Sequence, residues 1–263
     1  MDAPGSYVPA RGSAPYASRS YWDWRFGSEE AHEWLASWSD VRALVAPLLP
    51  AGRASRILLV GCGNSPMAAD MADDGYTSIV ASDYAPAVIR AMRVRCAASH
   101  PAIQWAVADM TSLTATFAPA SFDAVLDKAA MDAVLADGGD AWDPPPDLLA
   151  VGRRIVAQAG AVLRPGGAYI QISFAQPHFR RKYLVAPPTA DSGYAMPAGR
   201  GADGNGGDVA AGDDGGEEEG AYAFDGHIAT HKVDCGFGYA LFAMRRRAVV
   251  TDATAAPASL VVM

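Results

Sequence analysis

Short apolar runs alternate along this chain with longer segments in which apolar residues recur every three or four positions. The apolar runs predict β-strands at Ile57–Val60, Ser78–Ser82, Ile103–Val107, Phe122–Leu126 and Ala168–Phe174. The helical spacing predicts helices at Val41–Leu48, Pro86–Arg95 and Asp147–Leu163, and a further helix from Ser65-Pro66 to Gly75. Strands that alternate with helices in units of about 30 residues are typical of a doubly wound parallel sheet.

Two further strands close this arrangement near the end of the chain. Phe224–Val233 and Tyr239–Met244 flank Gly236 and predict an antiparallel pair. We therefore expect an α/β fold in which helices cover both faces of the sheet and an antiparallel hairpin closes it. We expect a single domain over residues 21–250, between a flexible N-terminus of residues 1–20 and a C-terminal tail of residues 251–263.

The net charge of −8 comes from one segment. The stretch Gly201–Gly220, "GADGNGGDVAAGDDGGEEEG", holds seven of the 29 acidic residues, and the other 22 face 21 basic residues. Its glycines raise the entropy of the unfolded chain and it has almost nothing to bury, so we predict a disordered acidic insertion over residues 187–220. An acidic docking arm is the alternative interpretation.

Cysteine content and the lengths of the apolar runs indicate the compartment. Cys62, Cys96 and Cys235 are odd in number and widely spaced, which favours a reducing compartment, the cytoplasm. No apolar run reaches the roughly 20 residues of a membrane span. No signal peptide is recognisable near Met1, and the Ala- and Ser-rich residues 1–20 leave a transit peptide as the alternative to a frayed N-terminus.

The residues that follow the predicted strands carry the candidate chemistry. The first strand runs into Gly61-Cys62-Gly63, and the next three strands end at or near Asp83, Asp109 and Asp127. The carboxyl ends of parallel strands lie at one edge of the sheet, where ligands of α/β proteins bind. We therefore expect the glycine turn and the three carboxylates to surround one small ligand.

The spacing of these residues indicates a ribose-bearing ligand without a pyrophosphate. Asp83 follows Gly61 by 22 residues, which suits a carboxylate bonded to both ribose hydroxyls. Pro66 stands where a dinucleotide-binding turn needs its third glycine, and no Gly-Lys-Ser/Thr follows as in a phosphate-binding loop. S-adenosylmethionine fits, with its amino-acid end over Gly61 and Gly63, its ribose on Asp83 and its adenine amine near Asp109.

Several motifs resemble those of class I, seven-strand, Rossmann-like methyltransferases: "GCGNS", "SDYAPAVI", "ADMTSL", "SFDAVLDKAAMDAV" and "LRPGGAYIQISF". Together with "YWDWRF" at Tyr21–Phe26 and "QPHFR" at Gln176–Arg180, they resemble the methyltransferase-like protein 13 and elongation factor 1-alpha lysine methyltransferase 4 family. The resemblance covers Tyr21 to about Tyr183. It implies a protein-lysine N-methyltransferase that uses S-adenosylmethionine, releases S-adenosylhomocysteine and acts on translation elongation factor 1-alpha.

The resemblance also implies a set of cofactor-binding residues: Trp22, Phe26, Trp34, Gly61, Cys62, Gly63, Asp83, Tyr84, Asp109, Met110 and Lys128. Asp83 would hold the ribose. Tyr84 would lie on the face of the adenine, which Asp109 and Met110 would bracket. Lys128, directly after the fourth strand, would sit near the methionine end of the cofactor.

Aromatic residues gather near the N-terminus, where four of the six tryptophans fall between Trp22 and Trp38. A sulfonium is a permanent cation without N–H donors, and each well-placed aromatic face contributes roughly 0.5–2 kcal/mol to binding it. On the resemblance, Trp22, Phe26 and Trp34 would lie against the cofactor in a lid that excludes water. For Trp24 and Trp38, the alternative to a cofactor contact is a purely structural role.

Methyl transfer needs positioning more than acid–base chemistry, because the leaving group is neutral. The enzyme has to hold the nucleophile about 3–3.5 Å from the methyl carbon. We predict Asp127 and Lys128 as the catalytic residues, with Asp127 orienting the incoming amine. Ala129-Ala130 replaces the Gly-Thr that relatives often carry, and "LDKAAM" lacks the "N/D-P-P-Y" signature of amide and adenine methylation.

Two other functions stay open on the sequence: a small-molecule methyltransferase on the same fold, and a non-catalytic module that binds cofactor and a partner. The near-neutral body of the chain argues against a nucleic-acid partner. The basic triplets Arg180-Arg181-Lys182 and Arg245-Arg246-Arg247 could meet an acidic protein surface. We expect a monomer with no metal ion and no membrane partner.

Overall fold

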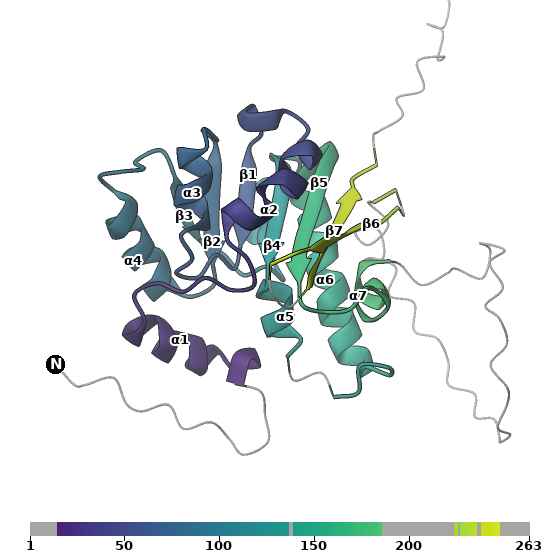
Figure 1. Cartoon of the computed structure of the whole chain (residues 1–263). Coiled ribbons are helices and arrows are strands. Elements are labelled where there is room, and N and C mark those ends of the chain that lie inside the picture. Colours follow the sequence, from purple (N-terminus) through teal and green to yellow (C-terminus); the bar gives the residue numbers. More distant parts are fainter. Residues whose placement is uncertain (1–14, 137–138, 186–223, 226, 236–237, 248–263) are drawn as a thin grey trace, which may run out of the picture.

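The computed structural model describes residues 15–136, 139–185, 224–225, 227–235 and 238–247, which form one seven-stranded sheet (Figure 1). The strands are β1 Ile57–Val60, β2 Ile79–Asp83, β3 Gln104–Val107, β4 Phe122–Lys128, β5 Leu163–Ser173, β6 Ala229–Val233 and β7 Tyr239–Arg245. Their order is β3-β2-β1-β4-β5-β7-β6. Strands β1 to β5 are parallel, whereas β7 is antiparallel to both β5 and β6. The expected α/β fold with a closing antiparallel hairpin is confirmed.

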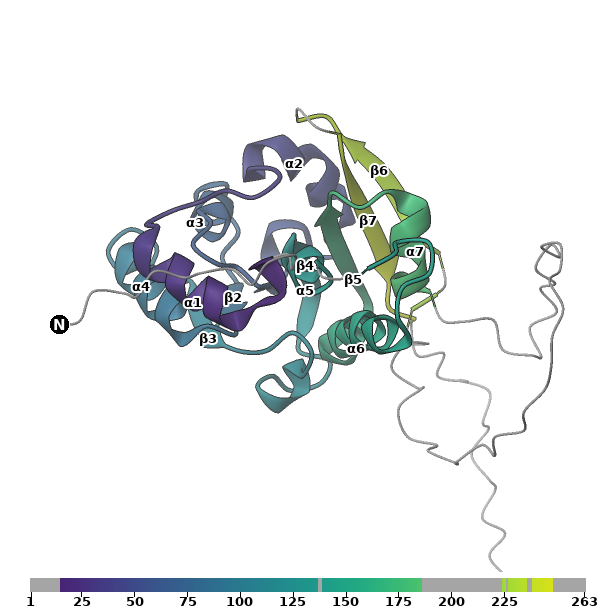
Figure 2. The same ribbon diagram turned by 90° about the horizontal axis from the view of Figure 1, so that it is seen from below.

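Two apolar clusters fill the space between the sheet and the helices on its two faces. The helices are α1 Arg19–Ser28, α2 Trp38–Val45, α3 Met67–Asp73, α4 Pro86–Cys96, α5 Ala130–Val134, α6 Pro146–Val162 and α7 Pro177–Leu184. Side chains of α2, α3 and α4 share the first cluster, and those of α5 and α6 share the second. Figure 2 shows α2 and α3 on one side of the sheet and α6 on the other.

Strand β1 explains why a short apolar run suffices at the centre of the sheet. All four of its residues are buried, because β2 and β4 pair with its two edges and helices cover both of its faces. Ile57 and Leu59 point into one cluster, and Leu58 and Val60 into the other. Successive side chains of a strand point to opposite faces of the sheet. When both faces are covered by helices, every position of the strand can therefore be apolar.

The strand registers bring the predicted chemistry to one edge. Val60 is level with Ser82 on β2 and with Asp127 on β4, while Asp83 is level with Val107 on β3. The turns that follow these strands therefore meet at the same edge. Helix α1 lies across that edge, as Figure 1 shows below the sheet.

The helices differ from the sequence expectations in three ways. Helix α2 is capped by Ser37 rather than at Ser39, because the Ser37 hydroxyl accepts the Asp40 N–H and the Asp40 carboxylate accepts the Ser37 N–H. The short helices α5 and α7 were not predicted. Helix α1 begins at Arg19, two residues before the expected domain boundary at Tyr21.

Several expectations concern residues outside the described ranges. These are the acidic insertion over residues 187–220, the tail over residues 251–263, residues 1–14 of the N-terminus and the turn at Gly236. Within the described ranges, no helix combines the length and the apolar character needed to cross a membrane.

The turn between β4 and α5 holds an unusual backbone conformation. Ala129 has φ 64° and ψ −4°, in the left-handed region. Its neighbour Ala130 lies against Gly61, where a Cβ would come within 2.3 Å of the Ala130 Cβ. The Gly expected at position 129 from the resemblance would adopt this conformation without steric cost, and Ala129 pays that cost here.

Replacing Ala129 by glycine should therefore stabilise the fold. We expect Ala129→Gly to raise the free energy of unfolding by about 1 kcal/mol in urea denaturation, since an L-residue in the left-handed region costs roughly 1–2 kcal/mol. Ala91→Gly, at an exposed position inside α4, is the matched control and should lower that free energy by about 1 kcal/mol. A loss of stability in Ala129→Gly would show that the left-handed turn is not strained.

Candidate functional site

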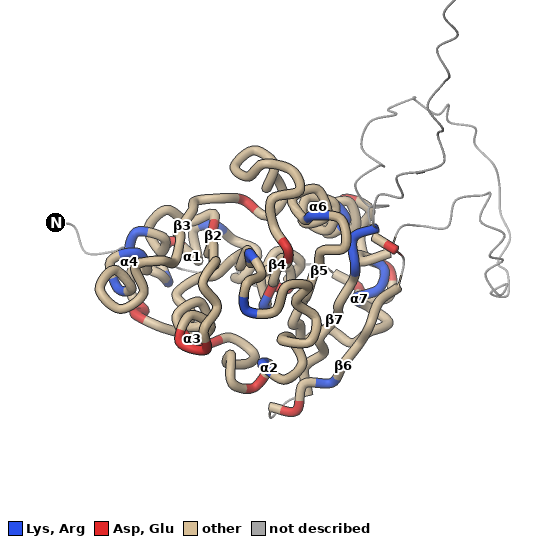
Figure 3. The backbone as a smooth tube through the Cα atoms, turned by 90° about the horizontal axis from the view of Figure 1, so that it is seen from above, with Lys and Arg blue, Asp and Glu red and all other residues tan. Residues whose placement is uncertain are grey.

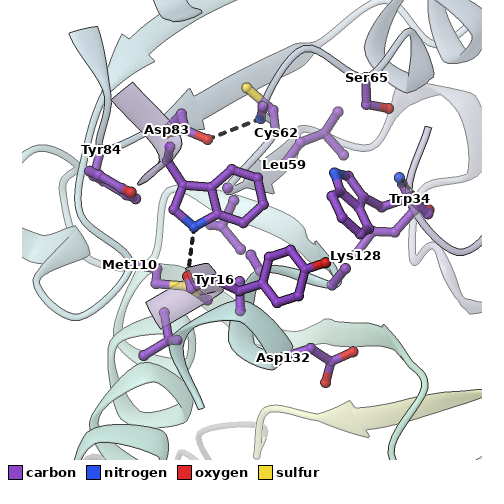
Figure 4. Close-up of a pocket in the computed structure, with 18 of the residues that line it drawn as sticks. Tyr16, Trp34, Leu59, Cys62, Ser65, Asp83, Tyr84, Met110, Lys128 and Asp132 are labelled. Atoms are coloured by element: carbon purple, nitrogen blue, oxygen red, sulfur yellow. Dashed lines mark hydrogen bonds between the residues drawn. The ribbon is translucent and has the colours of Figure 1, made fainter. Parts of the chain in front are cut away.

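A cavity of about 650 Å³ opens at the carboxyl edge of the parallel strands. Its walls come from the ends of β1, β2 and β4, from α1 and α5, and from a 3-10 turn at Pro15–Ala17. The predicted cofactor-binding residues that line it are Trp22, Phe26, Trp34, Gly61, Cys62, Gly63, Asp83, Tyr84, Asp109, Met110 and Lys128. That set is the full prediction, so every one of those residues reaches one cavity (Figure 4).

The glycine turn after β1 forms one wall of the cavity. Gly61 has φ 58° and Gly63 has φ 51°, a conformation that favours glycine at both positions. A Cβ at Gly63 would lie 3.4 Å from the ring of Phe26, so the bare backbone also leaves room for the aromatic wall. Cys62 lies between the two glycines in the sequence. Burial raises the pKa of its thiol well above its usual range, which keeps the thiol protonated.

Asp83 places a buried carboxylate beside this turn. Its Oδ2 accepts the Gly63 N–H at 3.0 Å, and its Oδ1 accepts the Ala85 N–H at 2.9 Å. Burial raises the pKa of Asp83, while these two backbone donors act in the opposite direction. Each oxygen keeps a lone pair for a further donor, so the carboxylate can accept two adjacent hydroxyl groups of a ligand.

The far end of this wall combines polar and aromatic groups. Asp109 is exposed, and its Oδ1 accepts hydrogen bonds from the backbone N–H and the hydroxyl of Thr111 at 2.8 and 2.7 Å. The Arg19 guanidinium donates to the Tyr84 carbonyl oxygen at 3.0 Å and lies 4.8 Å from the centre of the Tyr84 ring. Arg19 was not predicted as a site residue, because it lies in the segment that we expected to be flexible.

Aromatic rings from the N-terminal segment cover the cavity. Trp22 lies 5.5 Å from Phe26 and 5.9 Å from Trp34, measured between ring centres. Tyr16, which was not predicted, lies 5.6 Å from Trp34, and its carbonyl oxygen accepts the indole N–H of Trp22 at 2.6 Å. Trp38 is instead buried in the core, which agrees with the purely structural role that was the alternative for it.

Lys128 forms a part-buried ion pair that fastens this aromatic segment to the sheet. Its ammonium donates to the Glu33 carboxylate and, at 2.9 Å, to the Trp34 carbonyl oxygen. Ser65 donates to the two Glu33 oxygens at 2.9 and 3.1 Å. Burial lowers the pKa of Lys128, and the charge of Glu33 opposes that shift. Glu33 lies in a loop without a recognisable motif, so the sequence did not single it out.

The prediction that Asp127 contacts the incoming substrate is wrong. Asp127 is fully buried and does not line the cavity. Its Oδ1 accepts the N–H groups of Ala130 and Met131 at 3.0 and 3.2 Å. Its Oδ2 accepts the Tyr169 hydroxyl and the Gln171 amide at 3.0 and 2.8 Å. Burial raises the pKa of Asp127. Its oxygens accept hydrogen bonds that stabilise the turn between β4 and α5.

Asp132 on α5 does reach the cavity, and Figure 4 shows it on the side opposite Asp83. Its Oδ1 accepts the Ser173 hydroxyl at 2.6 Å and forms a buried ion pair with Arg180. Its Oδ2 accepts the Phe174 N–H at 3.2 Å. The cavity therefore has a carboxylate at each end and aromatic rings between them, which suits an elongated ligand with hydroxyl groups at one end and a cation in the middle.

Several residues of the two basic triplets are engaged within the fold, and an acidic partner surface for the triplets stays a prediction. Figure 3 shows basic positions on α6 and α7, but Arg180 is buried against Asp132. Lys182 donates to the carbonyl oxygens of Ala141 and Trp142. Arg246 donates to the Leu163 carbonyl oxygen. These three charges therefore stabilise the fold, whereas Arg181 and Arg247 are exposed.

The chain is similar to known methyltransferases in sequence. A family model described as a methyltransferase domain matches residues 57–167. The chain is 34% identical over 174 residues to EEF1A lysine methyltransferase 4 of Mus musculus, a match that covers 65% of this chain and 66% of that protein. It is 32% identical over 174 residues to eEF1A lysine and N-terminal methyltransferase of Homo sapiens, of which the match covers 24%.

The fold is also found in a solved structure with a different reaction. The crystal structure of the cyclase SpnF superposes with a TM-score of 0.50 at 14% identity, covering 85% of this chain and 91% of that one. At this level of identity the likeness concerns the fold alone, because one fold can host many different reactions.

The Lys128–Glu33 pair gives a test of how the aromatic segment is held. Glu33→Gln should lower the free energy of unfolding by about 1–3 kcal/mol, because it leaves the buried Lys128 ammonium without its charged partner. In the double variant Glu33→Gln with Lys128→Met, the loss should be smaller than the sum of the single losses. Urea denaturation measures all three.

A surface ion pair provides the control for this cycle. Lys232 and Asp234 are exposed, and Lys232→Met should leave the free energy of unfolding unchanged. Strict additivity of the Glu33 and Lys128 substitutions would contradict an energetic coupling between the two side chains.

Proposed function

We propose that this chain, which belongs to the class I S-adenosylmethionine-dependent methyltransferase family that includes EEF1A lysine methyltransferase 4, methylates a lysine of translation elongation factor 1-alpha. The observation that carries the proposal is the cavity at the sheet edge, where the glycine turn, the Asp83 carboxylate and the aromatic rings meet. We place this activity in the cytoplasm, where the reducing environment suits the three free cysteines.

We assign the end of the cavity at β2 and β3 to the nucleoside of S-adenosylmethionine. Asp83 accepts the ribose hydroxyls, because both of its oxygens are fixed by backbone donors and each retains a lone pair. Tyr84 and Met110 lie where they can enclose the adenine, and Asp109 can accept its amine. Asp109 is exposed, so it contributes less than the buried Asp83.

We assign the middle of the cavity to the sulfonium and the amino-acid end of the cofactor. When bound, S-adenosylmethionine supplies a methyl group attached to a positively charged sulfur. The rings of Trp22, Phe26 and Trp34 provide aromatic faces that attract such a cation and exclude water from it. Gly61 and Gly63 let the backbone approach the amino-acid end closely.

Lys128 acts in this proposal as a positioning residue. Its ammonium is engaged with Glu33 and with the Trp34 carbonyl oxygen, so it holds the aromatic segment against the sheet. Because these two partners engage its ammonium, we assign Lys128 no role in proton transfer. Lys128 thereby shapes the methionine end of the site through Trp34.

Cofactor binding is the first test of this assignment. The purified protein should bind S-adenosylmethionine and S-adenosylhomocysteine in calorimetry and should not bind NAD. Asp83→Ala removes a charged hydrogen-bond acceptor and should weaken both affinities roughly 10- to 150-fold. Asp73→Ala, at an exposed position on α3, is the matched control and should leave them unchanged. An unaltered affinity in Asp83→Ala would remove the ribose assignment.

The acceptor is tested by mass spectrometry. Recombinant elongation factor 1-alpha incubated with the enzyme and S-adenosylmethionine should gain the mass of one methylene per transferred methyl, on one lysine. Asp83→Ala should abolish this gain at cofactor concentrations near the wild-type dissociation constant. In whole lysate with labelled cofactor, label in the small-molecule fraction instead of protein would identify a small-molecule methyltransferase, and no label at all would favour a non-catalytic module.

A further inference from the structure

We propose that the part of the cavity beyond Lys128 receives the acceptor amine, and that the Asp132 carboxylate accepts a hydrogen bond from it. The inference rests on the proposed function for its premise that the acceptor is an alkylamine. It assigns to Asp132 the contact that the sequence had suggested for Asp127.

The position of Asp132 separates it from the proposed nucleoside site. Figure 4 shows its carboxylate across the Tyr16 ring from Asp83 and Cys62. Among the described residues, the carboxylates that line the cavity are Asp83, Asp109 and Asp132, and the first two belong to the nucleoside end. Asp132 is therefore the cavity-lining carboxylate that remains for the acceptor.

The lining around Asp132 suits the stem of a lysine side chain. Ala133, Val134 and Ala136 supply small apolar groups on this side of the cavity. Phe174 also lines it and is 62% exposed, which is unusual for a large apolar side chain. An extended four-carbon chain that enters past Phe174 would keep apolar contact until its amine meets the carboxylate.

Three neighbours hold the Asp132 carboxylate in a fixed orientation. The Ser173 hydroxyl, the Arg180 guanidinium and the Phe174 N–H donate to it. A carboxylate offers about four lone-pair sites, so one remains for the N–H of an amine. Within the described structure, Nε and Nη1 of Arg180 have no hydrogen-bond partner, so Asp132 is the group that compensates this buried charge.

The positive charge of Arg180 weakens the tendency of the Asp132 carboxylate to keep the acceptor amine protonated. A lysine amine, with an ordinary pKa of about 10.4, has to lose a proton before it can react. An isolated carboxylate would stabilise the ammonium and hold that proton. Because Arg180 offsets the charge of Asp132, the carboxylate can orient the amine while the proton leaves to water.

The transfer then balances without a further co-reactant. The lone pair of the acceptor nitrogen forms the new C–N bond, and the electron pair of the broken C–S bond stays on the sulfur. The sulfur ends neutral and the methylated nitrogen ends as an ammonium. Asp132 contributes direction, because its hydrogen bond fixes where the nitrogen lone pair points.

The test measures binding with a pair of probes that differ at one position. The probes are S-adenosylhomocysteine analogues that carry a short alkyl chain on the sulfur, ending in an amine in one and in a methyl group in the other. Calorimetry gives the affinity of both probes, and of S-adenosylhomocysteine, for each variant. Asp132→Asn alone leaves Arg180 buried and uncompensated, so the main variant is the double substitution Asp132→Asn with Arg180→Gln.

We expect the wild-type protein to prefer the amine probe over the methyl probe by roughly 10- to 100-fold, the worth of a hydrogen bond to a charged group. The double variant should lose this preference while its affinity for S-adenosylhomocysteine and its melting temperature stay near the wild-type values. Phe174→Ala, at an exposed position, should weaken both probes and raise the KM for protein substrate, again without affecting S-adenosylhomocysteine.

Two results would overturn the inference. One is a double variant that keeps the amine preference, and the other is a wild-type protein that shows none. If the double variant does not fold, an unchanged affinity of Phe174→Ala for both probes would overturn it independently. A third result would separate the inference from the proposed function. If the wild-type enzyme prefers the amine probe, and the double variant does not, but the wild-type enzyme fails to methylate elongation factor 1-alpha, then the amine site is supported and the proposed protein substrate is wrong.

Discussion

The site depends on one buried carboxylate, that of Asp127, which does not line the cavity. Asp127 binds the first N–H groups of α5 through one oxygen, and side chains of β5 through the other. These bonds fix the left-handed turn at Ala129, and with it the directions in which Lys128 and Asp132 leave the chain. An unpaired carboxylate at this depth would cost several kcal/mol, so its four donors are a condition of the fold.

The cavity has two halves, which polar contacts hold together. The sheet provides the glycine turn and the carboxylates, whereas the N-terminal segment provides the aromatic rings. Lys128 with Glu33 ties that segment to β4, and Arg19 ties it to the end of β2. Polar contacts therefore orient the aromatic segment, and the apolar rings fill the space beside the sheet. This combination is common in small-molecule sites.

The predictable part of the molecule is the part governed by local sequence. Apolar runs located the strands, and parallel pairing then placed Asp83 and Asp109 at one edge. The error at Asp127 has a physical cause: the partners that bury its carboxylate, Tyr169 and Gln171, are 42 and 44 residues away on β5. Glu33 and Asp132 were missed because their partners are 95 and 48 residues away, beyond the reach of any local pattern.

The hairpin has a consequence for how sequences of this family can diverge. Phe224 pairs with Arg246 beside Gly167, at the amino edge of the parallel strands, and the cavity lies at the opposite edge. The chain thus returns to the sheet on the side away from the chemistry. The segment ahead of Phe224 can therefore differ in length and charge without altering the walls of the cavity, as connecting segments generally do.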